Sequence, residues 1–377
     1  MPVNLLMIKK IKIFIKSIIN ALFHKIHIKK YLNDLGIFYL FNPKKIVNGM
    51  GILANSNGFV FSFLTNAYIS FILRPKFAKN FKQLSTEKNK YDDVGIIIQG
   101  AIGTEEEIKF ITNTIEIYKK IFPKINIIIS TWSDSKIKIK NSEYLKIIKN
   151  TYPSSNGNFN INYQIKTTSE AIRIFKSKGK KFILKTRTDC RILKPNTISF
   201  LKSLYDTFPT KNNLKRIFAL NILTTKFRTY GLSDILLFGH IEEIDKYFAP
   251  EEEEEIFKKY KLKKIYNNTA IAAEVLLCVR YLLSNGINLK WTNQHWWRIL
   301  RDYFGIIDAE TIDFFWHKHD WLYEKRFLRN YPYISSRCIE FNEWISLYNN
   351  FDLGWDRINY KETHIIKNKK IIKKRFY

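Results

Sequence analysis

The sequence has few cysteines, and those it has lie far apart. Only three occur among 377 residues, Cys190, Cys278 and Cys338, and none belongs to a Cys-x-x-Cys pair. This count and spacing argue against a disulfide framework and against a cysteine-based zinc site. The first residues also lack the cleavage site of a secretion signal, and lysines interrupt their apolar run. The sequence therefore predicts a protein of the reducing cytoplasm.

Acidic residues are scarce relative to basic ones. The chain has 34 acidic and 63 basic residues, which gives a formal net charge of +29. Such an excess favours anionic partners: nucleic acid, a membrane surface or phosphorylated small molecules. Codon bias acting on a solvated surface explains it equally well, since Lys, Ile and Asn are all abundant. The lysines are dispersed and no nucleic-acid-binding motif occurs, so we do not expect nucleic acid as a partner.

Several well-known catalytic and nucleotide-binding motifs are missing. The sequence contains no Walker A, G-x-G-x-x-G, G-x-S-x-G or H-E-x-x-H pattern. A glycine-rich phosphate loop is therefore excluded. If a nucleotide binds, a metal ion or basic side chains must meet its charge, and the candidates are Lys185, Arg187 and Arg191.

The N-terminal part is basic and patterned. Residues 5–23 place apolar side chains on one face of a helix and lysines on the other, as in helices that lie on an anionic bilayer or pack on a protein core. Residues 52–73 carry no charge, but Asn, Ser and Thr dilute them, so buried or interfacial structure is favoured over a membrane span. We predict that residues 1–90 form a basic extension able to associate with the inner face of the cytoplasmic membrane.

The central part alternates between strand and helix patterns. A continuous apolar run at residues 94–100 is typical of a central parallel strand, and a capping box at Thr104 and Glu107 opens the helix that follows. The alternation predicts an α/β fold with a Rossmann-like, mostly parallel sheet flanked by helices. We expect the main domain at 91–290 and an aromatic-rich C-terminal part, packed on it, at 291–377. The other predicted strands are 125–130, 144–149, 181–186, 216–223 and 233–238, and the helices are 104–121, 161–178, 196–206 and 270–283.

The strand at 181–186 ends in an acid between two arginines. Asp189 follows Arg187 and precedes Arg191, and ligands of open α/β sheets bind beyond the carboxyl ends of strands. The neighbouring positive charge keeps such a carboxylate ionised. Three roles remain open for Asp189: a Mg²⁺ or Mn²⁺ ligand, an acceptor for sugar hydroxyls, or the organiser of a salt bridge.

Other polar residues stand at predicted element ends. Gln99 and Gly100 close the first strand with an amide and a bare backbone, which a base or phosphate can approach. Asp134 and Asp234 lie at the ends of two further strands. Glu274 opens a helix, where it is either a general base or an acid favoured by the helix dipole.

Five ordered motifs resemble the WavE family of lipopolysaccharide-synthesis proteins. They are QGAI at 99–102, FPKINIIISTWSD at 122–134, NINYQIKTTSEAI at 160–172, ILKTRTDCRI at 183–192 and GLSDILLFG at 231–239. The resemblance covers roughly residues 93–285. It implies a GT-A-like glycosyltransferase with a Rossmann-type nucleotide-sugar domain, acting on lipopolysaccharide core or related surface glycans.

The resemblance also implies roles for particular residues. It places the donor nucleotide beside one set of side chains, the catalytic acid or metal ligand at Asp189, and the acceptor-side base at Asp234 or Glu274. Two departures stand out, since Ala101 replaces a proline and Arg191 replaces the second acid of an Asp-x-Asp pair. A Mg²⁺ or Mn²⁺ ion bound by Asp189 and neutralisation of the diphosphate by arginines are thus both open. Together with the basic side chains named above for their charge, the predicted donor-binding set is Gln99, Gly100, Thr131, Trp132, Asp134, Gln164, Lys185, Arg187 and Arg191.

We therefore expect a glycosyltransferase of hexosyltransferase type. Its donor would be a nucleotide-diphosphate sugar, and its acceptor a hydroxyl of a lipid-linked or lipopolysaccharide glycan or of a capsule glycan. One alternative is a sugar-phosphate or nucleotidyl transferase of surface glycan synthesis. The other is a non-enzymatic basic protein that binds nucleic acid or membranes, for which net charge is the only support.

Overall fold

The computed structural model describes residues 91–210, 214–262, 272–317 and 338–357. The predicted extension at 1–90, including the helix at 5–23 and the uncharged stretch at 52–73, lies outside the described residues. Within the described ranges, every helix is too short or too polar to cross a bilayer.

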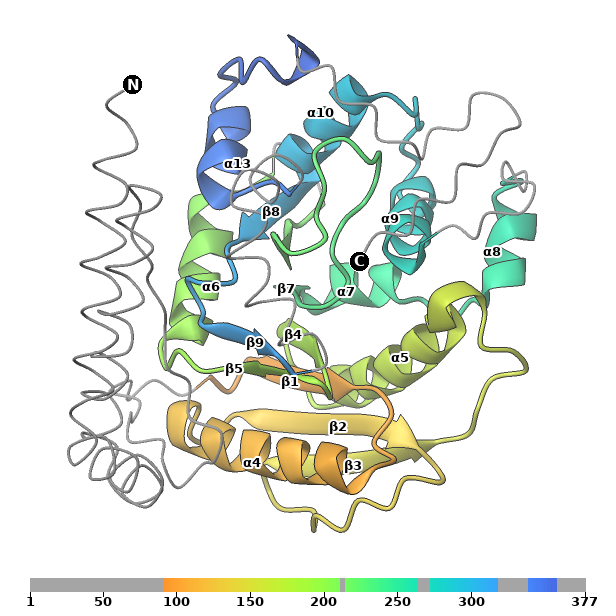
Figure 1. Cartoon of the computed structure of the whole chain (residues 1–377), viewed down its shortest axis with the longest axis vertical. Helices are drawn as coiled ribbons and strands as arrows, with labels where there is room; N and C mark the ends of the chain where they lie inside the picture. The colour runs from red at the N-terminus through yellow and green to blue at the C-terminus, as the bar shows by residue number, and fades with distance from the viewer. Residues whose placement is uncertain (1–90, 211–213, 263–271, 318–337, 358–377) are drawn as a thin grey trace, which may run out of the picture. The chain divides into compact units, whose positions relative to one another are not determined.

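A seven-stranded sheet forms the centre of the fold (Figure 1). Its strand order is β3-β2-β1-β4-β7-β6-β8, and all strands run parallel except β7, which is antiparallel to both of its neighbours. The predicted α/β fold with a mostly parallel sheet is thus confirmed. The strands are β1 (Val94–Gln99), β2 (Asn126–Trp132), β3 (Leu145–Asn150), β4 (Phe182–Arg187), β6 (Ile217–Leu220), β7 (Leu237–His240) and β8 (Phe304–Ile307).

Helices cover both faces of this sheet. Phe175 of α5 (Ile161–Ser177) lies against Gly95 of β1 on one face. Tyr205 of α6 (Thr197–Thr207) packs edge-on against Phe182 of β4 on the opposite face, since successive strand residues alternate in direction. The other helical elements are α4 (Glu105–Ile121), η3 (Asn158–Asn160), α7 (Ile241–Tyr247), α8 (Glu253–Lys259), α9 (Ala273–Ser284), α10 (Asn293–Tyr303), α13 (Phe341–Tyr348) and η5 (Trp355–Arg357).

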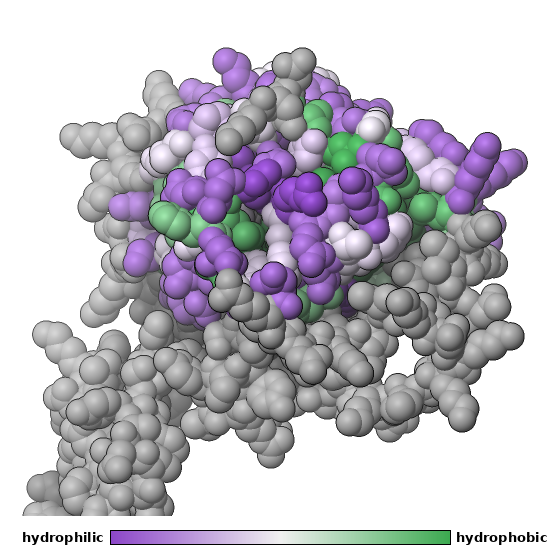
Figure 2. Space-filling view, turned by 90° about the horizontal axis from the view of Figure 1, so that it is seen from above, coloured by the Kyte–Doolittle hydropathy of each residue, from purple (hydrophilic) through white to green (hydrophobic). Residues whose placement is uncertain are grey.

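The aromatic-rich C-terminal part contributes to the same sheet. Within it, β8 pairs with β6, and the buried Trp344 of α13 donates to the carbonyls of Leu300 and Phe304 at the junction of α10 and β8. Figure 2 views the face over α10 and α13, where hydrophilic side chains gather at the centre and apolar areas lie to either side. The sequence did not predict β8, because four apolar residues carry no strand periodicity that separates them from the preceding helix.

The predicted strand at 233–238 is shifted in the structure. The observed β7 begins at Leu237. Leu237 is the first residue that pairs with a neighbouring strand, with Ala219 of β6 and Lys185 of β4, and Phe238 pairs with Phe218 of β6. Residues 233–236 instead form an irregular segment whose side chains are buried. This segment reaches the end of the sheet where the parallel strands finish.

The ends of β1 and β4 are joined tightly at Gly100. Its φ is +137°, and a Cβ atom there would lie 2.6 Å from Thr188 Oγ1. The backbone N–H of Thr188 donates to the carbonyl of Gln99 at 3.0 Å, which fixes this close approach. Glycine is therefore required by the Thr188 side chain as well as by the backbone conformation.

We expect Gly100→Ala to lower the free energy of unfolding by about 2 kcal/mol, because it combines a strained φ with a steric clash. Gly103→Ala is the matched control, since the nearest atom to its Cβ would be 3.9 Å away. Urea unfolding of the two variants measures the difference. Equal losses would contradict this interpretation of the junction.

Candidate functional site

The candidate site lies at the carboxyl edge of the sheet. Lys185 of β4 pairs with Leu237 of the antiparallel β7, so the residues before Leu237 extend past the carboxyl end of β4. This arrangement brings Asp234 to the edge where Gln99 ends β1 and where Asp189 follows β4. Polar side chains that are distant in sequence thus meet at one edge, as ligand sites of open α/β sheets do.

Asp189 forms a compact group with Arg187 and Trp316. The Arg187 guanidinium donates to both carboxylate oxygens, from Nε to Oδ1 at 2.9 Å and from Nη2 to Oδ2 at 3.0 Å. Trp316 Nε1 donates to Oδ2 at 2.9 Å, and its ring lies 5.6 Å from the guanidinium carbon. Pairing of β5 (Cys190–Ile192) with β9 (Phe314–Trp316) brings Trp316 here. Sequence reasoning missed this contact, because only that non-local pairing reveals it.

The charges in this group stabilise one another. Burial opposes the charge on Asp189, but the Arg187 charge and the donated hydrogen bonds outweigh it, so the pKa of Asp189 lies below its ordinary value. For Arg187, the charge of Asp189 and the hydrogen bonds to it outweigh burial, so its pKa is raised. Arg187 Nη1 donates to none of the described residues, so it remains available to an anionic ligand.

The surroundings of Asp189 do not fit a metal ion. Each carboxylate oxygen already faces two donors: Arg187 and the Cys190 thiol at Oδ1, and Arg187 and Trp316 at Oδ2. Mg²⁺ requires an octahedral set of oxygen ligands. Throughout the described ranges, no group of three or more His, Cys, Asp or Glu residues could hold a metal. We therefore assign no step to a metal ion.

A second polar group surrounds Asp234. Lys185 is fully buried, its Nζ lies 3.2 Å from Gln164 Oε1, and it also donates to the backbone carbonyl of Asp234. The Gln164 amide Nε2 donates in turn to Asp234 Oδ2 at 2.5 Å. The other oxygen, Oδ1, accepts no hydrogen bond from the part of the chain that the structure describes.

Burial and charge set the protonation of Lys185. Burial lowers its pKa to about 8, although the nearby Asp234 carboxylate favours the charged form; the positive charge of Arg187 adds to the lowering. Because Lys185 has no exposed surface, its ammonium cannot reach a diphosphate from solvent.

Arg191 points into the core beneath α4. Its Nε donates to Thr114 Oγ1 at 3.1 Å, and its Nη2 donates to the carbonyl of Phe110 at 3.0 Å. Burial lowers the pKa of Arg191 to about 10. Of the three basic side chains predicted to meet a diphosphate, only Arg187 is therefore partly exposed.

Glu274 lies close enough to Asp234 for the two carboxylates to interact electrostatically. Arg228 Nη2 donates to Glu274 Oε1 at 2.6 Å. Burial and the Asp234 charge nevertheless outweigh this pairing, so the pKa of Glu274 is raised. The two carboxylates predicted for the acceptor side thus share one electrostatic environment.

Three buried polar atoms around these carboxylates lack a hydrogen-bond partner among the described residues. They are Arg228 Nε, Ser233 Oγ and Tyr247 Oη. Arg228 pairs with Glu274, Ser233 adjoins Asp234, and the pKa of Tyr247 is raised by burial and by the charges of its neighbours, which include Asp234 and Glu274. Buried polar atoms normally find partners.

An aromatic group occupies the ends of β2 and β3. Tyr152 stacks on Trp132 with ring centroids 4.4 Å apart, and Tyr163 of α5 contacts Trp132 edge-on. The Tyr152 hydroxyl donates to Asp134 Oδ1 at 3.0 Å. Trp132 is buried, whereas Tyr152 is 45% exposed. Sequence reasoning missed Tyr152, although its place just after a strand that ends at this edge was a usable signal.

The remaining predicted residues are held by the protein itself. Gln99 Oε1 accepts from Thr167 Oγ1 of α5 at 3.0 Å, while its Nε2 donates to none of the residues that the structure describes. The space beside Gly100 is filled by Thr188. Thr131 is fully buried, and its hydroxyl lacks a partner within the described ranges.

Comparison with protein families supports the resemblance seen in the sequence. A family model described as WavE lipopolysaccharide synthesis matches residues 94–361. This range begins with β1, extends beyond the last described helix, and contains every predicted site residue. No curated protein matches the chain.

The buried lysine predicts a pH-dependent stability. The folded pKa of Lys185, about 8, lies below the ordinary value of 10.5, so folding favours the neutral form. Its contribution to stability is therefore present above pH 10.5 and is lost as the pH falls through 8. Relative to Lys185→Met, the wild-type free energy of unfolding should rise by about 3 kcal/mol between pH 8 and 10.5. Urea unfolding across this range measures it, and a constant difference between the two proteins would exclude the shift.

Proposed function

Because this chain belongs to the WavE lipopolysaccharide synthesis family, we propose that it is a glycosyltransferase. It moves a sugar from a nucleoside-diphosphate sugar to a hydroxyl of a lipopolysaccharide core or related surface glycan. The observation that carries the proposal is that two side chains lie at the same sheet edge. Asp234 has a carboxylate oxygen that accepts no hydrogen bond from the described residues, and Arg187 is partly exposed. Glycosyl transfer needs a proton acceptor and a positive charge for the leaving group.

In the proposed reaction, Asp234 Oδ1 takes the proton of the acceptor hydroxyl. The acceptor oxygen forms a bond to the anomeric carbon of the donor, and the bond from that carbon to the diphosphate oxygen breaks. The nucleoside diphosphate leaves with the electron pair. The transition state resembles an oxocarbenium ion, and Arg187 Nη1 meets the charge that develops on the diphosphate.

Asp189 serves this reaction by orienting Arg187. The bidentate pair fixes the plane of the guanidinium, and Trp316 donates a further hydrogen bond to Oδ2 of the same carboxylate. A fixed guanidinium needs no reorganisation when charge develops beside it. Asp189 is thus a positioning residue in this proposal, and Arg187 is the catalytic cation.

The donor nucleotide fits the ends of β1, β2 and β3. The exposed ring of Tyr152, backed by Trp132, offers a stacking surface for a base. Asp134 beside it can accept from ribose hydroxyls, and Gln99 Nε2 can donate. A lipid-linked acceptor would place the enzyme at the inner face of the cytoplasmic membrane, which the basic sequence of residues 1–90 favours.

We expect Asp189→Asn to reduce sugar transfer about 100-fold, because Arg187 loses its ionic partner and its fixed orientation. The assay combines purified full-length protein with a panel of nucleotide sugars and truncated lipopolysaccharide acceptors. Asp245→Asn is the control, since it removes an ion pair on the exposed side of α7. Absence of both transfer and donor hydrolysis in the wild type would refute the proposal, as would undiminished turnover of Asp189→Asn.

Transfer should also proceed without divalent cations, because the oxygens of Asp189 are engaged by protein donors. The initial rate in EDTA should equal the rate in Mg²⁺ or Mn²⁺. A rate that falls in EDTA and recovers on addition of Mn²⁺ would show that a metal, rather than Arg187, meets the charge of the diphosphate.

A further inference from the structure

Two buried side chains that the sequence predicts to bind the donor instead contact Asp234. We propose that Lys185 and Gln164 are positioning residues for Asp234: Lys185 fixes the Gln164 amide, and the amide fixes the carboxylate so that Oδ1 is left for the acceptor hydroxyl. This inference rests on the proposed function. It goes beyond that function in assigning Lys185 and Gln164 to proton transfer rather than to donor binding.

The order of donors and acceptors permits only one arrangement of this group. A lysine ammonium can only donate, so Lys185 Nζ must face the amide oxygen of Gln164, 3.2 Å away. The amide nitrogen of Gln164 then faces Asp234 Oδ2, which can only accept when ionised. The reversed amide would set two donors together at Lys185 and two acceptors together at Asp234. Both neighbours therefore select the same orientation of Gln164.

Lys185 holds the backbone of Asp234 as well as its side chain. Its Nζ donates directly to the Asp234 carbonyl. Residues 233–236 precede β7, where the N–H of Ser233 donates to Thr224 Oγ1 and the carbonyl of Leu236 accepts from the N–H of Leu220, and Lys185 adds the contact at Asp234 between them. One ammonium thus fixes both the main chain and, through Gln164, the carboxylate of the same residue. Hydrogen bonds from supporting residues of this kind hold a catalytic group in a productive geometry.

Burial of this lysine is difficult to explain by stability alone. A buried charge is costly, and an apolar side chain of similar length would fill the same place more favourably. The charged groups that act on Lys185 are Asp234, Arg187 and Asp189, and the ring of Phe248 after α7 covers the ammonium at 5.1 Å. Lys185 is closed off from solvent, so it can affect a substrate only through the residues that it touches.

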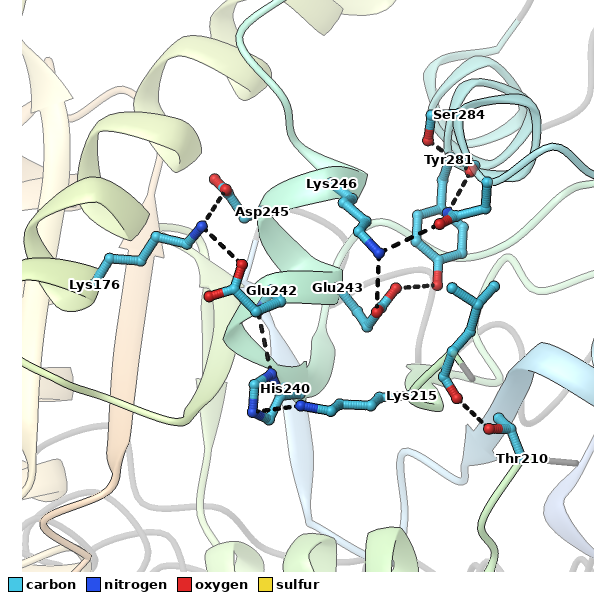
Figure 3. A network of polar contacts seen from close by, with 12 residues as sticks. Lys176, Thr210, Lys215, His240, Glu242, Glu243, Asp245, Lys246, Tyr281 and Ser284 are labelled. Carbon is cyan, nitrogen blue, oxygen red and sulfur yellow. Dashed lines mark hydrogen bonds and ion pairs between the residues drawn. The ribbon is translucent and has the colours of Figure 1, made fainter. Parts of the chain in front are cut away.

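A double-mutant cycle tests this connection. We expect Lys185→Met and Gln164→Leu each to lower kcat about 100-fold while the donor KM stays unchanged, because misplacement of a proton acceptor affects the chemical step. The double variant should lose no more than either single variant, since both interrupt the same chain of contacts. Lys176→Met is the matched control: this lysine of α5 pairs with Glu242 and Asp245 of α7, outside the site (Figure 3).

Gln164→Glu gives a second readout that does not require removal of the lysine. The new carboxylate keeps the shape of glutamine and can still pair with Lys185, but it repels Asp234 across the 2.5 Å contact. We expect the acid limb of the pH–rate profile to move to higher pH, with the profile of Lys176→Met unchanged. If Lys185→Met does not fold, this shift alone decides the question.

Three results would overturn the inference in an active wild-type enzyme: additive losses in the double variant, an unmoved acid limb in Gln164→Glu, or a raised donor KM. Thermal unfolding with and without nucleoside diphosphate provides a check independent of turnover. The positioning variants should retain the stabilisation by nucleotide, and its loss would show that these side chains bind the donor. Absence of transfer by the wild type would instead overturn the proposed function, and this inference with it.

Discussion

The direction of one strand determines which side chains meet at the carboxyl edge of the sheet. In a purely parallel sheet, the residues before a strand lie at the amino edge, far from the ligand side. Because β7 is antiparallel to β4, the segment before it returns to the carboxyl edge and carries Asp234 there. Lys185, from the middle of β4, anchors that segment. The Asp234 group therefore depends on a single reversed strand and on the buried lysine beside it.

The two ionic groups at this edge differ in how their positive charge is balanced. Arg187 and Asp189 form a bidentate ion pair. This pair raises the pKa of Arg187 and holds its guanidinium in one orientation at a partly exposed position. Lys185 has no carboxylate in direct contact and is balanced through Gln164 and the field of Asp234, which leaves one oxygen of Asp234 unengaged among the described residues. The first arrangement suits the stabilisation of a leaving group, and the second suits the acceptance of a proton.

Local pattern predicted much of the fold and part of the site. The apolar run of β1, the capping box of Thr104 and the polar end of β4 depend on neighbouring residues, and the structure confirms them. The contact of Trp316 with Asp189 depends on a β5–β9 pairing between distant segments, so no local signal reveals it. A lysine inside a strand pattern also suggests an exposed position, whereas Lys185 is buried by α5 and by the segment before β7. Whether a charge is buried is decided by tertiary contacts, which a single sequence does not display.

In the proposed reaction, the bond that breaks lies between the sugar and the diphosphate. Mass spectrometry of the nucleotide released in an acceptor-dependent reaction tests it most directly. We expect intact nucleoside diphosphate, formed in equal amount to the sugar transferred and greatly reduced in Asp189→Asn. Release of nucleoside monophosphate with transfer of a sugar phosphate would contradict it, because the displaced bond would then be the phosphoanhydride.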